Sequence, residues 1–362
     1  MRFAFTEEQE ELRSTVRKLL DRHGGPPIPD PGAPDAGFDP ALWKQLGEIG
    51  AHALAIPEEH DGVGATLLET LIVVEELGRR LVNNPFLGSS VLSAQALLAA
   101  GNTEACERLL PGIASGEQVV SLAWAEADSP WSVSTFATSA ELGAEGWRID
   151  GRKTLVLDAT RADVLLVVAM ADGEASLFEV SPSTTATAST PLDLTRSIGE
   201  VHLSGTSAQL IGAAPLQRIT DAAAAAVAAE SIGAAQRWLH ETVEYTKLRK
   251  QFGRPIGSFQ AIKHRLADCY AAIESARSLS YAASWAVSTQ DDQAGELASM
   301  AKSACCEAYS LIAAEGVQLH GGIGITWEHE AHLHLKRAHA AKHLFGTPQS
   351  HRASLPLRGT AD

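Results

Sequence analysis

Positive charge is scarce in this sequence. There are 29 Lys and Arg against 44 Asp and Glu, which gives a net charge of −15 with His neutral. A broad nucleic-acid-binding surface needs a basic face, and adhesion to anionic membranes needs basic clusters. We therefore expect no nucleic-acid partner and no membrane partner. Any anionic ligand would have to meet a local basic island within an acidic surface.

Cysteine and long apolar runs are scarce as well. The four cysteines are Cys106, Cys269, Cys305 and Cys306, and none forms a Cys-x-x-Cys pair. This spacing excludes a disulfide framework and a zinc finger. No signal peptide precedes Phe3, and every apolar run ends before the roughly 18 residues of a membrane span. The expectation is a cytoplasmic protein.

What the chain does contain is an ordinary apolar content of 45%, which excludes intrinsic disorder, and a length of 362 residues, which suits two or three domains. Helical periodicity gives way near Val119 to short β-branched runs separated by turn residues, and helix returns after Pro215. We expect a mainly α protein with a small β domain, divided into residues 1–118, 119–214 and 215–362.

Local signals place the helices. Thr6 and Gln9 have the spacing of a capping box, which predicts a first helix here. A Pro/Gly loop is expected over Pro26–Pro34. Further helices are predicted around residues 42–49, 66–80, 90–100, 103–114, 221–249, 259–289 and 295–319, and a last one after the turn Gly321–Gly324.

A basic island stands out between two long predicted helices. Six cations lie in 19 residues, with Gly253 and Pro255 forcing a turn among them: Lys247, Arg249, Lys250, Arg254, Lys263 and Arg265. Arginine offers a fork of donors that suits a diphosphate. The alternative is a solvated face of two helices, and charge alone favours that alternative.

A glycine-rich segment follows the third long helix. It differs from the dinucleotide-binding fingerprint, because Trp327 stands where the third glycine is needed and because the segment follows a helix. Glu328 beside Trp327 is a candidate general base, if an apolar pocket raises its pKa. The alternative is a surface carboxylate that compensates a helix dipole.

Histidines crowd the last predicted helix. His339 and His343 have the i, i+4 spacing of metal ligands, but Ala340 stands where a His-Glu-x-x-His site needs its glutamate. We expect solvated histidines and no metal. The other members of the cluster are His329, His332 and His334, with Glu330 nearby.

These segments together resemble the acyl-CoA dehydrogenases over nearly the whole chain. The resemblance rests on the joint order of several strings: Phe5-Thr6-Glu7-Glu8-Gln9, residues 54–64, Arg249-Lys250-Gln251-Phe252-Gly253 with Phe259-Gln260, and residues 318–324. The joint order and spacing of these strings identify the family far more specifically than any one string does. With this resemblance, a diphosphate site becomes the preferred interpretation of the basic island, in place of a solvated face of two helices.

The resemblance implies an N-terminal helical domain, a middle β-barrel domain and a C-terminal four-helix bundle that hold FAD in an oligomer, either a homotetramer or a heterotetramer. It implies that Arg249, Gln251 and Phe252 reach the FAD of a neighbouring subunit. Gln318, Gly321 and Gly322 would join them around the diphosphate and adenine.

The implied reaction is α,β-dehydrogenation of an acyl-CoA thioester. In it Glu328 would take the α-proton, a hydride would pass to flavin N5, and an electron-transfer flavoprotein would accept the electrons. Some members carry the base on the first helix of the last domain, where this chain has Ala223. Two other functions stay open: a non-catalytic subunit that completes another chain's FAD site, and a flavin oxidase or monooxygenase.

The chain also departs from the family pattern where side chains meet the flavin ring. Leu155 and Leu157 stand where an aromatic residue and a threonine are usual, and Trp124-Ala125-Glu126-Ala127 replaces a Thr-Glu-Pro string. Ala224 aligns with a substrate-contacting arginine, and Phe345 replaces the glutamate of a Glu-Gly-Thr string. This pattern is similar to that of divergent actinobacterial-type subunits that act on sterol side chains or other bulky acyl-CoA esters.

Overall fold

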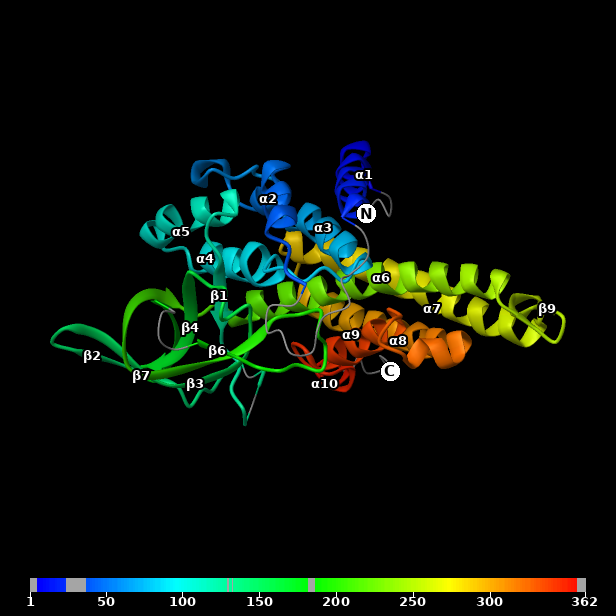
Figure 1. Cartoon of the computed structure of the whole chain (residues 1–362). Helices are drawn as coiled ribbons and strands as arrows, with labels where there is room; N and C mark the ends of the chain where they lie inside the picture. Colours follow the sequence, from blue (N-terminus) through cyan, green and yellow to red (C-terminus); the bar gives the residue numbers. More distant parts are fainter. Residues whose placement is uncertain (1–4, 24–36, 129, 132, 182–185, 357–362) are drawn as a thin grey trace, which may run out of the picture.

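The computed structural model describes residues 5–23, 37–128, 130–131, 133–181 and 186–356. A group of short helices and a β domain lie side by side at one end of a long helical bundle, and the bundle extends away from both (Figure 1). The expected fold class, mainly α with a small β domain, is confirmed. The loop predicted over Pro26–Pro34 lies outside the described residues.

Most of the first helices begin where the sequence supplies capping side chains. The Thr6 hydroxyl accepts from the Gln9 N–H and the Gln9 amide oxygen accepts from the Thr6 N–H, so the predicted capping box is present. Residues 87–93 form a π-helical turn, where we expected the start of an α-helix. The α-helices of this part are α1 Glu7–Arg22, α2 Pro40–Glu48, α3 Leu67–Arg79, α4 Ala94–Ala100 and α5 Thr103–Ser115.

The β domain closes into a barrel. The pairing runs from β4 through β5, β7, β3 and β2, and a single pair, Ser139 with Met170, returns it to β4. Closure leaves fewer free strand edges, and the barrel interior holds its own apolar core. The strands are β1 Val120–Ala123, β2 Ser139–Gly143, β3 Gly146–Leu157, β4 Val164–Ala171, β5 Glu174–Val180, β6 Ala186–Ala188 and β7 Ile198–Ala213.

Long helices form the bundle, because their sequences are rich in alanine and contain no internal proline. The last long helix begins at Ala331, several residues later than expected, because a 3₁₀ turn over Gly321–Ile325 and an irregular segment precede it. The helices are α6 Leu216–Leu248, α7 Gln260–Ser288, α8 Ala294–His320, α9 Ala331–His343 and the short α10 Pro348–Ala353.

Two glycines let α3 pack closely on α6. A Cβ added at Gly233 would lie 1.9 Å from the Glu75 carbonyl oxygen, and one at Gly78 would lie 2.3 Å from the Glu230 carbonyl oxygen. Nearby, the buried Arg337 guanidinium lies 3.0 Å from Glu230 and 2.9 Å from Asp193, which precedes β7. These contacts join the N-terminal helices, the β domain and the helical bundle. No helix in the described ranges is both long enough and apolar enough to span a bilayer.

Candidate functional site

The basic island forms an exposed corner at the tip of the bundle. The corner, residues 249–259, leaves α6, runs through the two-residue strands β8 Lys250–Gln251 and β9 Arg254–Pro255, and enters α7 (Figure 1). Phe252 and Gly253 turn the chain with φ values of +51° and +78°. The Phe252 ring is 92% exposed, which is unusual for a large apolar side chain.

The cations of the basic island, in and beside the corner, are only partly neutralised. Lys247 pairs with Glu244 and Arg265 with Glu315, each at 2.6 Å. Among the described residues, neither Arg249 nor Lys250 has a carboxylate within 4.0 Å, and the Arg254 guanidinium lies over the Phe259 ring at 3.9 Å. The corner therefore keeps a positive surplus in a chain that is acidic overall, as a diphosphate would require.

The glycine-rich turn lies at the same end of the bundle as the corner. Tyr245, one helical turn before Arg249, stacks on the His320 ring at 4.1 Å and donates to the His320 carbonyl oxygen. Gln318 is exposed, and a Cβ added at Gly321 or Gly322 would meet no atom within 4 Å. Through this contact the glycine-rich turn is held against α6, one helical turn before the first cation of the corner.

Glu328 lies in the irregular segment between the turn and α9, and its side chain is exposed. Its own backbone N–H and then the Thr326 hydroxyl lower the pKa of this carboxyl below its usual value. The predicted apolar pocket with a raised pKa is therefore wrong for Glu328. The neighbouring Trp327 ring instead lies against Lys336, 4.2 Å away, and His332.

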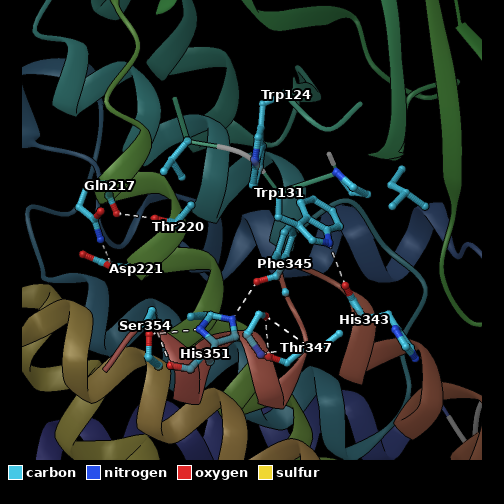
Figure 2. Close-up of a pocket in the computed structure, with 17 residues that line it drawn as sticks. Trp124, Trp131, Gln217, Thr220, Asp221, His343, Phe345, Thr347, His351 and Ser354 are labelled. Carbon is cyan, nitrogen blue, oxygen red and sulfur yellow. Dashed lines mark hydrogen bonds between the residues drawn. The ribbon is translucent and has the colours of Figure 1, made fainter. Parts of the chain in front are cut away.

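A cavity of about 590 Å³ lies between the barrel and the bundle (Figure 2). Three aromatic rings form one wall: Trp124 stacks on Phe345 at 5.3 Å with an interplanar angle of 10°, and Trp131 meets both edge-on. Gln217, Thr220 and Asp221 from the start of α6 line another side, with residues of α10 below them. Glu328 is not among the lining residues.

The departures from the family pattern meet in this cavity. Trp124, Leu155, Ala224 and Phe345 come from four separate segments, and all of them line it. Leu157 is buried close by in sequence and carries no hydroxyl. The substitutions that appear scattered along the sequence thus change a single site.

The wall of the cavity is held rigidly. Phe345 has a φ of +60°, an uncommon conformation for a residue with a side chain. The His351 imidazole donates from Nε2 to the Phe345 carbonyl oxygen at 2.9 Å, and the buried Lys302 ammonium donates to the Gly346 carbonyl oxygen at 3.0 Å. Trp131 donates from Nε1 to the His343 carbonyl oxygen at 2.9 Å.

An ion pair joins β3, the strand that carries Leu155, to the segment that follows β1. The Lys153 ammonium is fully buried and lies 2.7 Å from the Glu126 carboxylate. Burial raises the pKa of Glu126, but Lys153, Thr138 and the Ala137 N–H outweigh burial and lower it to about 2. Burial lowers the pKa of Lys153 to about 8 despite its partner.

The histidine cluster differs from the expectation of solvated side chains, which is wrong for His334. This ring is buried, and its Nδ1 lies 2.9 Å from the Tyr309 hydroxyl. Glu241, Glu330 and His334 bring their ligand atoms within 4.8 Å of one another, yet the Arg237 guanidinium contacts Glu241 and lies 3.7 Å from Glu330. Arg237 thus already supplies the positive charge that a metal ion would bring.

Several cavity residues were missed by sequence reasoning. Trp131, Asp221 and His351 belong to no motif, and all three lie outside the glycine-rich segment. The sequence did contain one indication of this cavity, namely the residues that depart from the family pattern. The structure places those residues around the cavity.

Comparison with known proteins agrees with the geometry. Residues 6–117 match the N-terminal domain and residues 212–356 the C-terminal domain of acyl-CoA dehydrogenases. The chain belongs to the acyl-CoA dehydrogenase family. It is 40% identical over 348 residues to acyl-CoA dehydrogenase IpdE2 of Mycobacterium tuberculosis, which covers 95% of this chain and 94% of that relative.

Two solved structures share the fold over nearly the full length. The ChsE4–ChsE5 complex from Mycobacterium tuberculosis contains a chain with a TM-score of 0.86 at 28% identity, covering 98% of this chain and 100% of that one. A variant of the Tcur3481–Tcur3483 steroid ACAD gives a TM-score of 0.85 at 29% identity, covering 96% of both chains.

FAD is the cofactor of this family. This chain differs in how well its residues suit the two ends of FAD, the diphosphate and the flavin ring. The corner presents arginine forks and exposed amides suited to a diphosphate. The cavity is lined by Leu155, with Leu157 buried nearby, so it lacks the aromatic side chain and the threonine hydroxyl that the resemblance places at the flavin ring. The residues of the corner fit the diphosphate end of FAD, and the cavity lacks part of the usual side-chain contacts to the ring.

Proposed function

We propose that this protein is one subunit of a heteromeric, FAD-dependent acyl-CoA dehydrogenase and that its corner completes the FAD site of the partner subunit. The observation that carries this proposal is the continuity of α6. Ala224 of the cavity lies on that helix and Arg249 of the corner directly follows its last residue, so the two are about 37 Å apart at 1.5 Å per residue. A straight helix keeps the corner away from the cavity of its own chain, so the corner serves another subunit.

The composition of the two sites supports this division of labour. Arg249, Gln251 and Phe252, with Gln318, Gly321 and Gly322, provide exposed groups for the diphosphate end of FAD. The cavity of this chain, in contrast, holds aromatic and aliphatic side chains at the positions that usually contact the ring. One such chain paired with a complete subunit would give one working site for each pair.

The reaction of the assembly would be α,β-dehydrogenation of an acyl-CoA thioester, with FAD as the hydride acceptor and an electron-transfer flavoprotein as the next carrier. A steroid-derived or similarly bulky acyl group is favoured, because one structural neighbour is described as a steroid ACAD. Another neighbour is a complex of two differently named chains, ChsE4 and ChsE5, which supports a heteromeric assembly.

Flavin content tests the proposal. The chain purified alone should be colourless, and co-expression with a family subunit that has complete ring contacts should give a yellow complex with one FAD per pair. Arg249→Gln in this chain should reduce the flavin content of the complex. A yellow protein with one FAD per chain, purified without a partner, contradicts the proposal.

A second candidate is a catalytic chain with Glu328 as base. It is favoured by the position of Glu328 directly after the glycine-rich turn, where the resemblance places the base of many family members. Glu328→Gln would then abolish acceptor reduction by acyl-CoA while FAD stays bound. Under the subunit proposal the same variant, assembled with its partner, keeps its turnover.

A further inference from the structure

Trp238 is a buried tryptophan of α6 that packs against three histidine rings. The His320 and His334 rings stack on the indole at centroid distances of 5.0 and 4.5 Å, with interplanar angles of 16° and 17°. The His329 ring meets the indole edge-on at 6.1 Å. A Cβ added at Gly316 would lie 2.0 Å from the indole Nε1 atom, so α8 has space for this ring only because it carries a glycine here.

The three histidines lie at the two ends of one segment, residues 321–328. His320 is the last residue of α8 and directly precedes the segment. His329 directly follows it, and His334 lies in the first turn of α9. Trp238 therefore contacts the chain both before and after this segment. Most of the segment itself is exposed, so the contacts at its ends largely decide where it lies.

Each histidine is held by a second contact. The His320 Nδ1 atom donates to the Gly316 carbonyl oxygen at 2.7 Å, and the His334 Nδ1 atom lies 2.9 Å from the Tyr309 hydroxyl. The His329 Nδ1 atom accepts from the N–H of the first residue of α9 at 3.1 Å. Burial lowers the pKa of all three rings, which favours neutral imidazoles that stack on the indole without desolvating a charge.

We propose that Trp238 is a positioning residue, which holds both ends of the segment 321–328 and so sets the place of its open glycine backbone and of Glu328. The proposal rests on the proposed function only where FAD is concerned, because Gly321 and Gly322 are assigned there to the diphosphate end. Trp238 holds the segment whichever ligand the segment meets.

Limited proteolysis of the full-length chain tests this placement. Chymotrypsin cuts after aromatic residues, and Trp327 in the segment is 49% exposed. Cleavage requires local opening of the chain, so its rate after Trp327 measures how firmly the segment is held. In Trp238→Leu the histidines lose the ring on which they stack, and we expect cleavage to be about tenfold faster or more. Trp238→Phe keeps a ring and should stay within about threefold of the wild type.

Trp43 provides a matched control. It is a second buried tryptophan that packs on a histidine, His52, at 3.9 Å, but it lies among the N-terminal helices. Trp43→Leu should lower the melting temperature and leave cleavage after Trp327 within about threefold of the wild type. His320→Leu keeps Trp238 and replaces one stacked ring, so it should accelerate cleavage and keeps the test valid if Trp238→Leu does not fold.

Wild-type cleavage in both Trp238→Leu and His320→Leu would overturn the proposal. Equal acceleration in Trp43→Leu or in Trp238→Phe would overturn it too, because general destabilisation or lost volume would then explain the effect. Acceleration confined to Trp238→Leu and His320→Leu supports it.

The flavin content of the assembled enzyme is a separate measurement, and Trp238→Leu should lower it. Faster cleavage with unchanged flavin content supports the placement of the segment and contradicts the assignment of Gly321 and Gly322 to FAD. Unchanged cleavage overturns the role of Trp238 and leaves the proposed function intact. The two failures are therefore distinguishable.

Discussion

The Lys153 ammonium lies 2.7 Å from the Glu126 carboxylate in a position where the lysine is fully buried. Lys153 belongs to β3, which continues to Leu155, and Glu126 follows the segment that carries Trp124. Because the ammonium also approaches the Trp124 carbonyl oxygen, the pair links two walls of the cavity. The contact therefore stabilises the barrel and also helps to fix the shape of the cavity.

Removing one partner of this pair should destabilise the fold strongly. Glu126→Gln leaves a buried ammonium without a counter-charge, which costs about 3–5 kcal/mol in the free energy of unfolding. Denaturant unfolding measures the loss. Glu141→Gln on the exposed side of β2 is the control and should stay within about 0.5 kcal/mol of the wild type. Equal effects of the two variants would contradict the structural role of the pair.

The same carboxylate predicts a loss of stability in acid. The pKa of Glu126 is lowered from 4.5 to about 2 in the folded protein, so the unfolded chain binds more protons between these values. The contribution of the ion pair is fully present above about pH 4.5 and is lost as the pH falls toward 2. Thermal melting from pH 6 to pH 2 should show a shallower acid decline in Glu126→Gln than in the wild type.

The corner should control flavin retention in the assembled enzyme. Arg249→Gln removes an exposed guanidinium, and loss of a charged hydrogen bond costs about 1.5–3 kcal/mol, or roughly 10- to 150-fold in FAD affinity. Lys247→Gln is the matched control, because Glu244 already pairs with Lys247. Flavin absorbance after gel filtration distinguishes the two variants. Equal flavin loss in both would mean that overall positive charge, rather than Arg249, retains the cofactor.

The glycine contact between α3 and α6 should tolerate no side chain. Gly233→Ala would place a methyl group 1.9 Å from the Glu75 carbonyl oxygen, so the helices must separate. We expect a loss of roughly 1–3 kcal/mol or more in the free energy of unfolding. Gly322→Ala, whose Cβ meets no atom within 4 Å, is the control for stability. A wild-type melting temperature for Gly233→Ala would contradict the close packing of α3 on α6.

The elements whose formation is local were predicted well from the sequence. The capping box at Thr6 and Gln9, the long alanine-rich helices and the turn at Gly253 each depend on a few neighbouring residues. The environment of Glu328 was not predictable in this way. Whether a carboxylate is buried depends on what packs over it, and no described segment covers this one.

The cavity could not be predicted from the sequence, because the residues that line it are far apart along the chain. Trp124, Ala224 and Phe345 are separated by about a hundred residues each, and nothing local marks them as neighbours. Their departure from the family pattern indicated an altered flavin site. Only the packing of the barrel on α6 and α10 reveals the aromatic wall and the polar side that replace it.

The single helix α6 also sets the rotational phase of the two sites it joins. Each residue of an α-helix advances about 100° around the axis, so one residue inserted midway would turn the corner by more than a quarter of a circle relative to the cavity. Helix length between Ala224 and Arg249 is therefore a constraint of its own, separate from the identity of the side chains. An insertion or deletion within α6 would therefore change the direction in which the corner faces, even if every side chain of the corner and the cavity were kept.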